Sequence, residues 1–126
     1  TESMNYDIDE RYNAVVIQLK GNVMGGPDGS DLRDTLDELK EEEKTNVVID
    51  VSRVNFMNSS GLGLLVGGLT SMRNAGGDVR LANVADRIRS LLIITKLITI
   101  FKTYESVGEA VESFDEDPPE EGSDEA

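Results

Sequence analysis

The chain has 126 residues, which suits one domain with a core of ordinary size. It contains no cysteine and no histidine, and this excludes disulfides, thiolate metal sites, imidazole bases and phosphohistidine relays. The formal net charge is −13, from 25 acids against 12 bases. Such a surface repels phosphates, so we expect no direct nucleic-acid partner.

The charge is concentrated at one end of the chain. Residues 115–126 hold seven acids and no base, so the other 114 residues carry −6. This acidic tail cannot bury apolar surface, and we expect a domain over residues 1–114 followed by a disordered segment. No apolar run is long enough to span a membrane and no signal-peptide pattern is present, which predicts a cytoplasmic protein without membrane insertion. An acidic excess suits a salt-rich cytoplasm, although an ordinary acidic protein explains it equally well.

The first part of the chain predicts a hairpin, a loop and a helix. Alternation over residues 4–8 indicates an edge strand, and residues 14–19 form a strong second strand that Gly21 closes. Residues 21–30 hold four glycines and a proline without a P-loop or dinucleotide-binding pattern, which predicts a flexible surface loop. Ser30 is then the expected cap of a helix that ends near Glu43 and whose inner face carries Leu32, Leu36 and Leu39.

The central segment predicts a buried strand followed by a helix. Residues 47–51 are an almost continuous β-branched run, typical of a strand buried on both faces. After the polar turn 58–61, apolar residues recur at helical spacing: Leu62, Leu65, Val66, Leu69 and Met72. A turn in this position is where α/β folds place functional residues, and a helix N-terminus favours an anion such as phosphate.

Two glycines, Gly67 and Gly68, lie inside this second helix, which residues 74–77 end. Each costs about 1 kcal/mol relative to Ala. Close packing within the fold and a flat face for a partner explain these glycines equally well.

The remaining pattern predicts a strand over 78–81, a helix capped by Asn83, a strand over 98–101 and a last helix. The last helix is expected to begin at Ser106, with Glu109 completing a capping box. The order β-β-α-β-α-β-α-β-α predicts an α/β fold with a mixed sheet of about five strands and about four helices, packed mainly on one face.

The segment from Asp50 to Gly63, and above all Asn58-Ser59-Ser60-Gly61-Leu62-Gly63, resembles the signature of the STAS domain, the fold of bacterial anti-sigma factor antagonists. The resemblance extends more loosely over residues 6–114 and implies the STAS fold. It also implies phosphorylation at Ser59 and a partner-binding motif formed by Asn58, Ser60, Gly61, Leu62 and Gly63. By its residue type, Ser60 is either the helix cap, which we favour, or a second phosphate acceptor.

Three positions depart from the family pattern. Asn58 stands where the family usually has an acid, and Val23 or Met24 stands where an Asp is common. Lys96 replaces a glycine at a helix-to-strand turn, which predicts an altered turn there.

The function that this resemblance implies is a reversible charge switch without a cofactor. The unphosphorylated protein would bind an anti-sigma factor that is also a serine kinase and free its sigma factor. Phosphorylation of Ser59 would abolish binding, and a serine phosphatase would reset the state.

Other classes of function remain open at this point. A STAS adaptor subunit of a lipid-transport ABC complex needs no phosphorylation, and the departures at Asn58 and Met24 suit it. An enzyme with Ser59 as nucleophile lacks any recognisable base, so we expect no enzymatic activity. A nucleotide-binding role lacks a phosphate loop.

Overall fold

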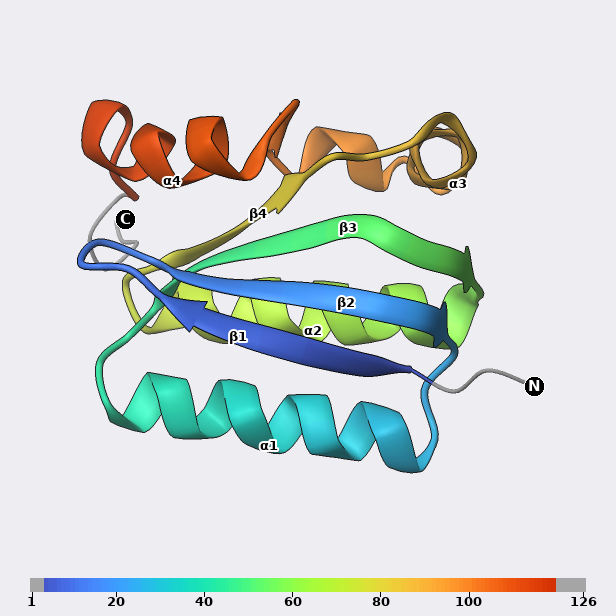
Figure 1. Cartoon of the computed structure of the whole chain (residues 1–126), viewed down its shortest axis with the longest axis horizontal. Coiled ribbons are helices and arrows are strands. Elements are labelled where there is room, and N and C mark those ends of the chain that lie inside the picture. Colours follow the sequence, from blue (N-terminus) through green and yellow to red (C-terminus); the bar gives the residue numbers. More distant parts are fainter. Residues whose placement is uncertain (1–3, 120–126) are drawn as a thin grey trace.

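Within residues 4–119, which the structure describes, the computed structural model folds into one mixed sheet of five strands with four α-helices around it (Figure 1). The elements are β1 (Asn5–Glu10), β2 (Val15–Val23), α1 (Pro27–Glu41), β3 (Asn46–Met57), α2 (Ser59–Asn74), β4 (Asp78–Ala82), α3 (Asp86–Ile94), the 3₁₀ helix η1 (Leu97–Thr99), β5 (Thr103–Tyr104) and α4 (Val107–Glu116). The strands lie in chain order across the sheet, with β1 antiparallel to β2 and the others parallel. The predicted fold class is confirmed.

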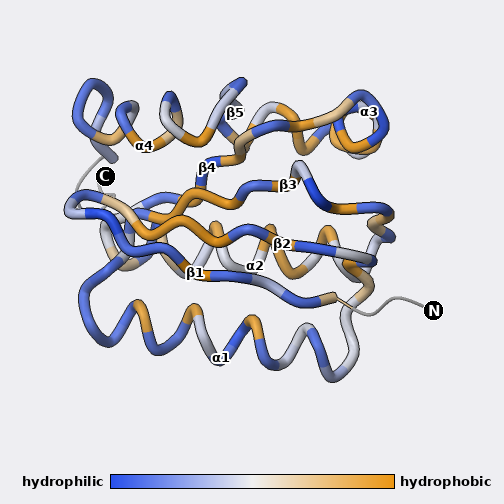
Figure 2. The backbone as a smooth tube through the Cα atoms, viewed as in Figure 1, coloured by the Kyte–Doolittle hydropathy of each residue, from blue (hydrophilic) through white to orange (hydrophobic). Residues whose placement is uncertain are grey.

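Different helices cover the two faces of the sheet. Helices α1 and α2 cover one face and α4 covers the other (Figure 1). The larger core is centred on Ile17, Ile49 and Leu81, which lie in register on adjacent strands. On the opposite face, Val48 packs in a smaller core with Phe114 of α4. Figure 2 shows the apolar residues along the central strands and on the inner sides of the helices, as expected for strands buried on both faces.

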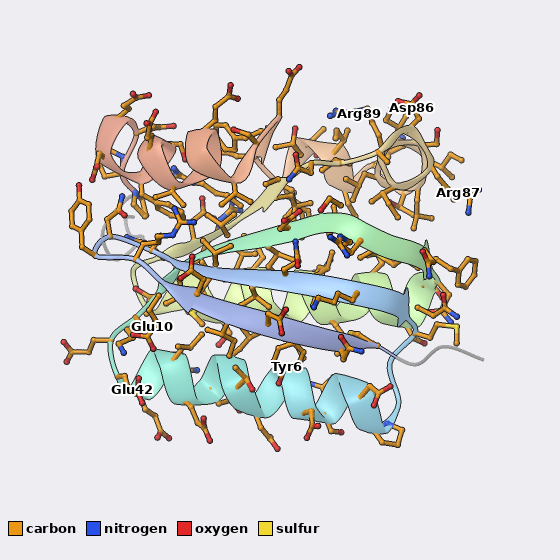
Figure 3. The ribbon with its side chains drawn as sticks, viewed as in Figure 1. Tyr6, Glu10, Glu42, Asp86, Arg87 and Arg89 are labelled. Atoms are coloured by element: carbon orange, nitrogen blue, oxygen red, sulfur yellow. The ribbon has the colours of Figure 1, made fainter. Side chains whose placement is uncertain are left out.

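The edge strand β1 is fastened to α1 by polar side chains. The Tyr6 hydroxyl lies 2.7 Å from the Thr35 hydroxyl. Lys44 pairs with Glu10 at 2.9 Å and with Glu42 at 3.2 Å, so it links the end of β1 to the residue after α1 (Figure 3). These contacts hold the edge strand β1 against α1.

The predicted loop over residues 21–30 is largely wrong. Strand β2 continues through Gly21, whose φ of 87° falls where the pairing with β3 shifts register. Helix α1 begins at Pro27 after Gly26, which has φ of 74°, so the predicted cap at Ser30 is wrong as well. A proline is well suited to the first helical position because its φ is already helical and its missing N–H is not needed there.

The predicted strand over residues 98–101 is also wrong. This segment begins in η1, and the last strand is the two-residue β5 at Thr103–Tyr104. The β-branched run forms a turn because its side chains pack onto the larger core, and packing overrides strand propensity. Lys96 adopts φ of 66° just before η1, the left-handed conformation that glycine adopts without steric cost.

Asn83 is not the cap of α3. It has φ of 60°, and α3 begins three residues later at Asp86. The side chain of Asn83 instead donates to the Asp50 carboxylate at 3.0 Å. The cap is predicted from the residue type of Asn83, whereas the hydrogen bond to Asp50 accounts for the observed position of its side chain.

The cap of the last helix is confirmed, because the Glu109 N–H donates to the Ser106 hydroxyl at 3.1 Å. The Glu109 carboxylate accepts from the Glu105 N–H at 3.4 Å, one residue before the cap. Helix α4 ends at Glu116, two residues into the predicted tail, and Asp117 pairs with Lys102 at 2.7 Å. Residues 120–126 of that tail lie outside the described residues, so the division into domain and tail stays a prediction.

One arginine is completely buried and joins β4 to the end of α4. Arg80 pairs with Asp78 at 2.9 Å and donates to the Ser113 hydroxyl at 2.8 Å. It also donates to the Asp117 carbonyl at 2.7 Å, and its guanidinium lies 4.2 Å from the centre of the Phe114 ring. Because a buried charge is costly unless it is paired and hydrogen-bonded, this network fixes one end of the sheet.

Candidate functional site

The turn between β3 and α2 is capped by Asn58. Its side-chain oxygen accepts from the Gly61 N–H at 2.9 Å, and its backbone carbonyl accepts from the Leu62 N–H at 2.9 Å. The backbone of Asn58 is extended, as a cap requires. The predicted capping role of Ser60 is therefore wrong: Ser60 lies in the first turn of α2 and is exposed.

Ser59 is the first residue of α2, and its side chain is exposed. Among the described residues its hydroxyl has no hydrogen-bond partner, and neither do the N–H groups of Ser59 and Ser60. These open donors lie at the positive end of the helix dipole. The arrangement therefore leaves the Ser59 oxygen accessible and surrounds it with groups that favour a bound phosphate.

The turn rests on the end of β2, and Gly61 makes this contact possible. A methyl group at Gly61 would lie 1.9 Å from the carbonyl oxygen of Val23, so no larger residue fits without movement of the backbone. The Asn58 N–H donates to the same oxygen at 3.3 Å. A methyl group at Gly25, where φ is 82°, would lie 3.1 Å from the Ser60 Cβ. The segment from Val23 to Gly25 thus packs directly against the backbone of the turn.

The structure divides the six predicted motif residues into two groups. Ser59, Ser60 and Gly63 are exposed and Asn58 is half-buried, so these four reach the surface. Gly61 and Leu62 are buried, and Leu62 belongs to the larger core. Any contact of those two residues with a partner is therefore indirect, through the shape of the turn.

Two exposed apolar side chains lie in the segments that meet at the turn. Met24 and Phe56 are 40% and 45% exposed, and the first turn of α2 has no acidic residue. Arg87 of α3, labelled in Figure 3, donates to the Asn55 carbonyl at 3.3 Å, three residues before Asn58. Within the described part of the chain, no group of three or more acidic side chains is arranged to hold a metal ion.

A buried carboxylate that sequence reasoning missed links β3 to the loop before α3. Asp50 accepts hydrogen bonds from Asn83 at 3.0 Å, from the Ser52 N–H at 2.9 Å and from Gln18 at 3.0 Å. Burial alone would raise the pKa of Asp50, but these hydrogen bonds outweigh it and hold the pKa below its usual value. Nothing in the local sequence identifies this bond, because Asn83 comes 33 residues later.

Comparison with known proteins gives a consistent picture. A model of the STAS domain family matches residues 5–110. The anti-sigma-B factor antagonist of Bacillus subtilis (strain 168) is 33% identical over 97 residues, which cover 75% of this chain and 85% of that protein. A putative anti-sigma factor antagonist of Thermotoga neapolitana, a TM1081 homolog, is 32% identical over 76 residues, covering 60% of this chain and 67% of that protein.

Solved structures share the fold. A putative anti-sigma factor antagonist from Thermotoga maritima superposes with a TM-score of 0.75 at 22% identity, covering 86% of this chain and 92% of its own. The anti-sigma factor antagonist SpoIIAA in its unphosphorylated form superposes with a TM-score of 0.69 at 20% identity, covering 89% and 96%. No helix within residues 4–119 is long and apolar enough to cross a membrane. The chain belongs to the STAS domain family.

Proposed function

We propose that this protein is an anti-sigma factor antagonist. Its unphosphorylated form binds an anti-sigma factor that is also a serine kinase, and phosphorylation of Ser59 ends that binding. The observation that carries the proposal is the accessible Ser59 hydroxyl, placed beside two open N–H groups at the start of α2. The curated relatives named above are anti-sigma factor antagonists, which supports the same role.

The phosphoryl transfer requires a base that this chain does not supply at the turn. The Ser59 oxygen attacks the γ-phosphorus of ATP held by the kinase, the new O–P bond forms, and ADP leaves. The hydroxyl proton passes to a base of the kinase, because the amide of Asn58 accepts hydrogen bonds but no proton at neutral pH. Asn58 therefore acts as a positioning residue that holds the turn through its bond to Gly61.

The added phosphate separates binding from folding. It brings roughly −1.5 to −2 charges at pH 7. At the N-terminus of α2 the dipole and the open N–H groups favour this charge, so the fold is kept. In a docked interface the same charge loses its hydration and has no new partner, which costs several kcal/mol. A serine phosphatase restores the binding form.

A second candidate is an adaptor subunit of a lipid-transport ABC complex. Two observations favour it: the turn has Asn58 as an uncharged cap, and Met24 stands exposed where the family often has an acid. In this case the same surface is a constitutive contact and Ser59 is never modified.

Affinity capture from the native cytosol tests both candidates. The protein is used as bait with and without ATP, and phosphate on the bait is mapped by mass spectrometry. We expect capture of a serine kinase that is lost as phosphate appears on Ser59, and retention of the kinase by Ser59→Ala in the presence of ATP. Capture of ABC-transporter subunits with Ser59 unmodified would replace the proposal by the adaptor role.

A further inference from the structure

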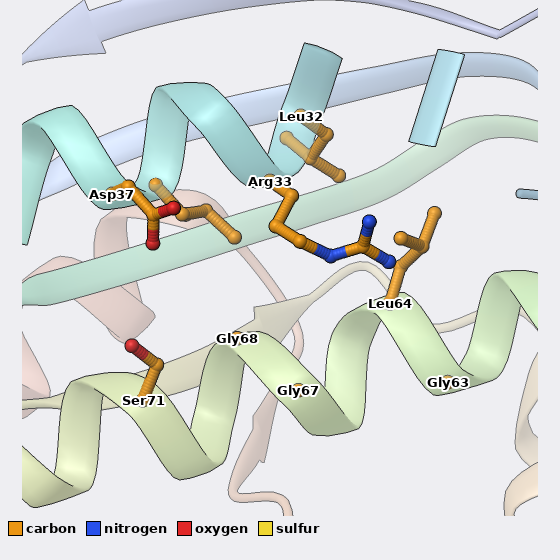
Figure 4. Close-up of a pocket in the computed structure, with 9 residues that line it drawn as sticks. Leu32, Arg33, Asp37, Gly63, Leu64, Gly67, Gly68 and Ser71 are labelled. Carbon is orange, nitrogen blue, oxygen red and sulfur yellow. The ribbon is translucent and has the colours of Figure 1, made fainter. Parts of the chain in front are cut away.

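Helices α1 and α2 leave a surface groove between them (Figure 4). Its volume is about 200 Å³, and it is more apolar than polar. The α1 side is formed by Leu32, Arg33, Leu36 and Asp37, and the α2 side by Gly63, Leu64, Gly67, Gly68 and Ser71. We call this the α1–α2 groove.

The glycines of α2 differ in what they do for the fold. A methyl group at Gly68 would lie 3.0 Å from the Cδ1 of Leu36, so its small size lets the two helices pack. At Gly63 and Gly67 a methyl group would meet nothing within 4 Å, and both residues are exposed. A glycine inside a helix is less stable than an alanine. The fold therefore gains nothing from glycine at these two positions.

The α2 side of the groove lies on the same helix face as the candidate phosphorylation site. Ser59, Gly63 and Gly67 are spaced four residues apart and so lie on the same face of α2. A protein that contacts the Ser59 hydroxyl reaches the groove by following this face for two turns. Without side chains at the two glycines, the backbone of that protein can approach α2 closely.

The α1 rim of the groove carries one cation, Arg33, and one acid, Asp37, which lies four residues further along α1 (Figure 4). The two cations of α1 both lean towards α2: Lys40 donates to the Ser71 hydroxyl at 3.0 Å, and Arg33 extends from α1 towards Leu64 (Figure 4). Within residues 4–119 the Arg33 guanidinium has no hydrogen bond or ion pair. A guanidinium without an internal partner is suited to a carboxylate of a bound protein, and Asp37 on the same rim confines that carboxylate to the Arg33 end of the groove.

We propose that the α1–α2 groove is the second half of the docking surface for the anti-sigma factor serine kinase. A segment of the kinase inserts one large apolar side chain into the groove and presents a carboxylate to Arg33. An apolar cavity of ~150 Å³ is enough for a benzene molecule, so the groove has room for one such side chain. This inference rests on the function proposed above and names where the partner binds beyond Ser59.

The test measures binding and stability on the same variants of the full chain. The probe is the purified serine kinase identified by the capture experiment. We expect Gly67→Leu, which fills the groove, and Arg33→Glu, which reverses the charge of that side chain, each to bind the kinase at least tenfold more weakly. Thr70→Leu is the matched control, because Thr70 is exposed on α2 outside the groove, and we expect it to bind like wild type. Gly67→Ala should raise the Tm.

The outcomes separate this inference from the proposed function. If Ser59→Glu abolishes binding while Gly67→Leu and Arg33→Glu bind like wild type, the groove proposal is wrong and the proposed function stands. If Gly67→Ala lowers the Tm, the glycine serves the fold and the argument for close approach fails. If the wild-type protein does not bind the kinase at all, both proposals fall together.

Discussion

The two ends of the parallel strands are built alike in backbone and differently in polarity. At each end a glycine lies in close contact with a backbone carbonyl. A methyl group at Gly77 would lie 1.9 Å from the Thr45 oxygen, and a methyl group at Gly61 would lie 1.9 Å from the Val23 oxygen. Three residues after Gly77, the Arg80 side chain donates hydrogen bonds to Asp78, Ser113 and the Asp117 carbonyl, all within the fold. Beside Gly61, the Ser59 hydroxyl has no internal partner among the described residues. One end holds the fold together through internal bonds, and the other is the end at which we propose a change of charge.

The largest effect is expected at the internally bonded end. Arg80→Ala should lower the free energy of unfolding by about 3 kcal/mol or more, the lower part of the range for breaking a buried ion pair. Asp78 keeps its bond to Arg73 at 2.8 Å, but Ser113 and the Asp117 carbonyl lose their donor. Urea unfolding measures the loss. Arg33→Ala is the control, because Arg33 is exposed and has no partner among residues 4–119; an equal loss there would contradict the distinction between the two arginines.

Within α2, the next largest effect separates two glycines of the same motif. Gly61→Ala should destabilise the protein by about 1–3 kcal/mol, because its methyl group must displace the backbone at Val23. Gly63→Ala should instead stabilise it by up to about 1 kcal/mol, because the added methyl group meets open space and alanine favours the helix. Thermal unfolding of both variants gives the sign directly. Shifts of the same sign would show that the contact with Val23 does not decide the role of Gly61.

A smaller effect identifies the residue that caps α2. Asn58→Ala should cost about 1 kcal/mol, since the Gly61 N–H loses its acceptor. Ser60→Ala should change the stability by less than about 0.5 kcal/mol, as for other exposed positions. Asn58→Asp keeps an acceptor and is the matched control. Chemical denaturation of the three variants is decisive, and a loss at Ser60 equal to that at Asn58 would contradict the observed cap.

The sequence predicts the parts of this fold that depend on local pattern. The apolar residues of α1, the β-branched run of β3 and the cap at Ser106 are each recognisable within a few residues, and each is confirmed. The site motif is equally local, which is why Ser59 is found at the start of a helix as expected.

The errors fall where distant residues decide the structure. Asn83 is a residue type suited to a cap, but its side chain bonds to Asp50 on the neighbouring strand β3, 33 residues earlier in the chain. The apolar run near Ile98 has high strand propensity, yet it packs on the core as a 3₁₀ turn. At the site itself, the prediction of Ser60 as the cap is wrong, and identifying Asn58 instead depends on knowing that β3 ends at Met57.

The smallest effect on stability, and the one on which the switch depends, is expected at Ser59. Ser59→Glu places a negative charge at the first position of α2, where the dipole favours it by about 0.3–1 kcal/mol; Ser59→Lys should shift the stability slightly in the other direction. The Tm values of the two variants should therefore bracket that of wild type. If Ser59→Glu instead unfolded the protein, loss of partner binding on phosphorylation would be a folding defect. A Tm at or above that of wild type would mean that the charge acts on the interface alone, which a reversible switch requires.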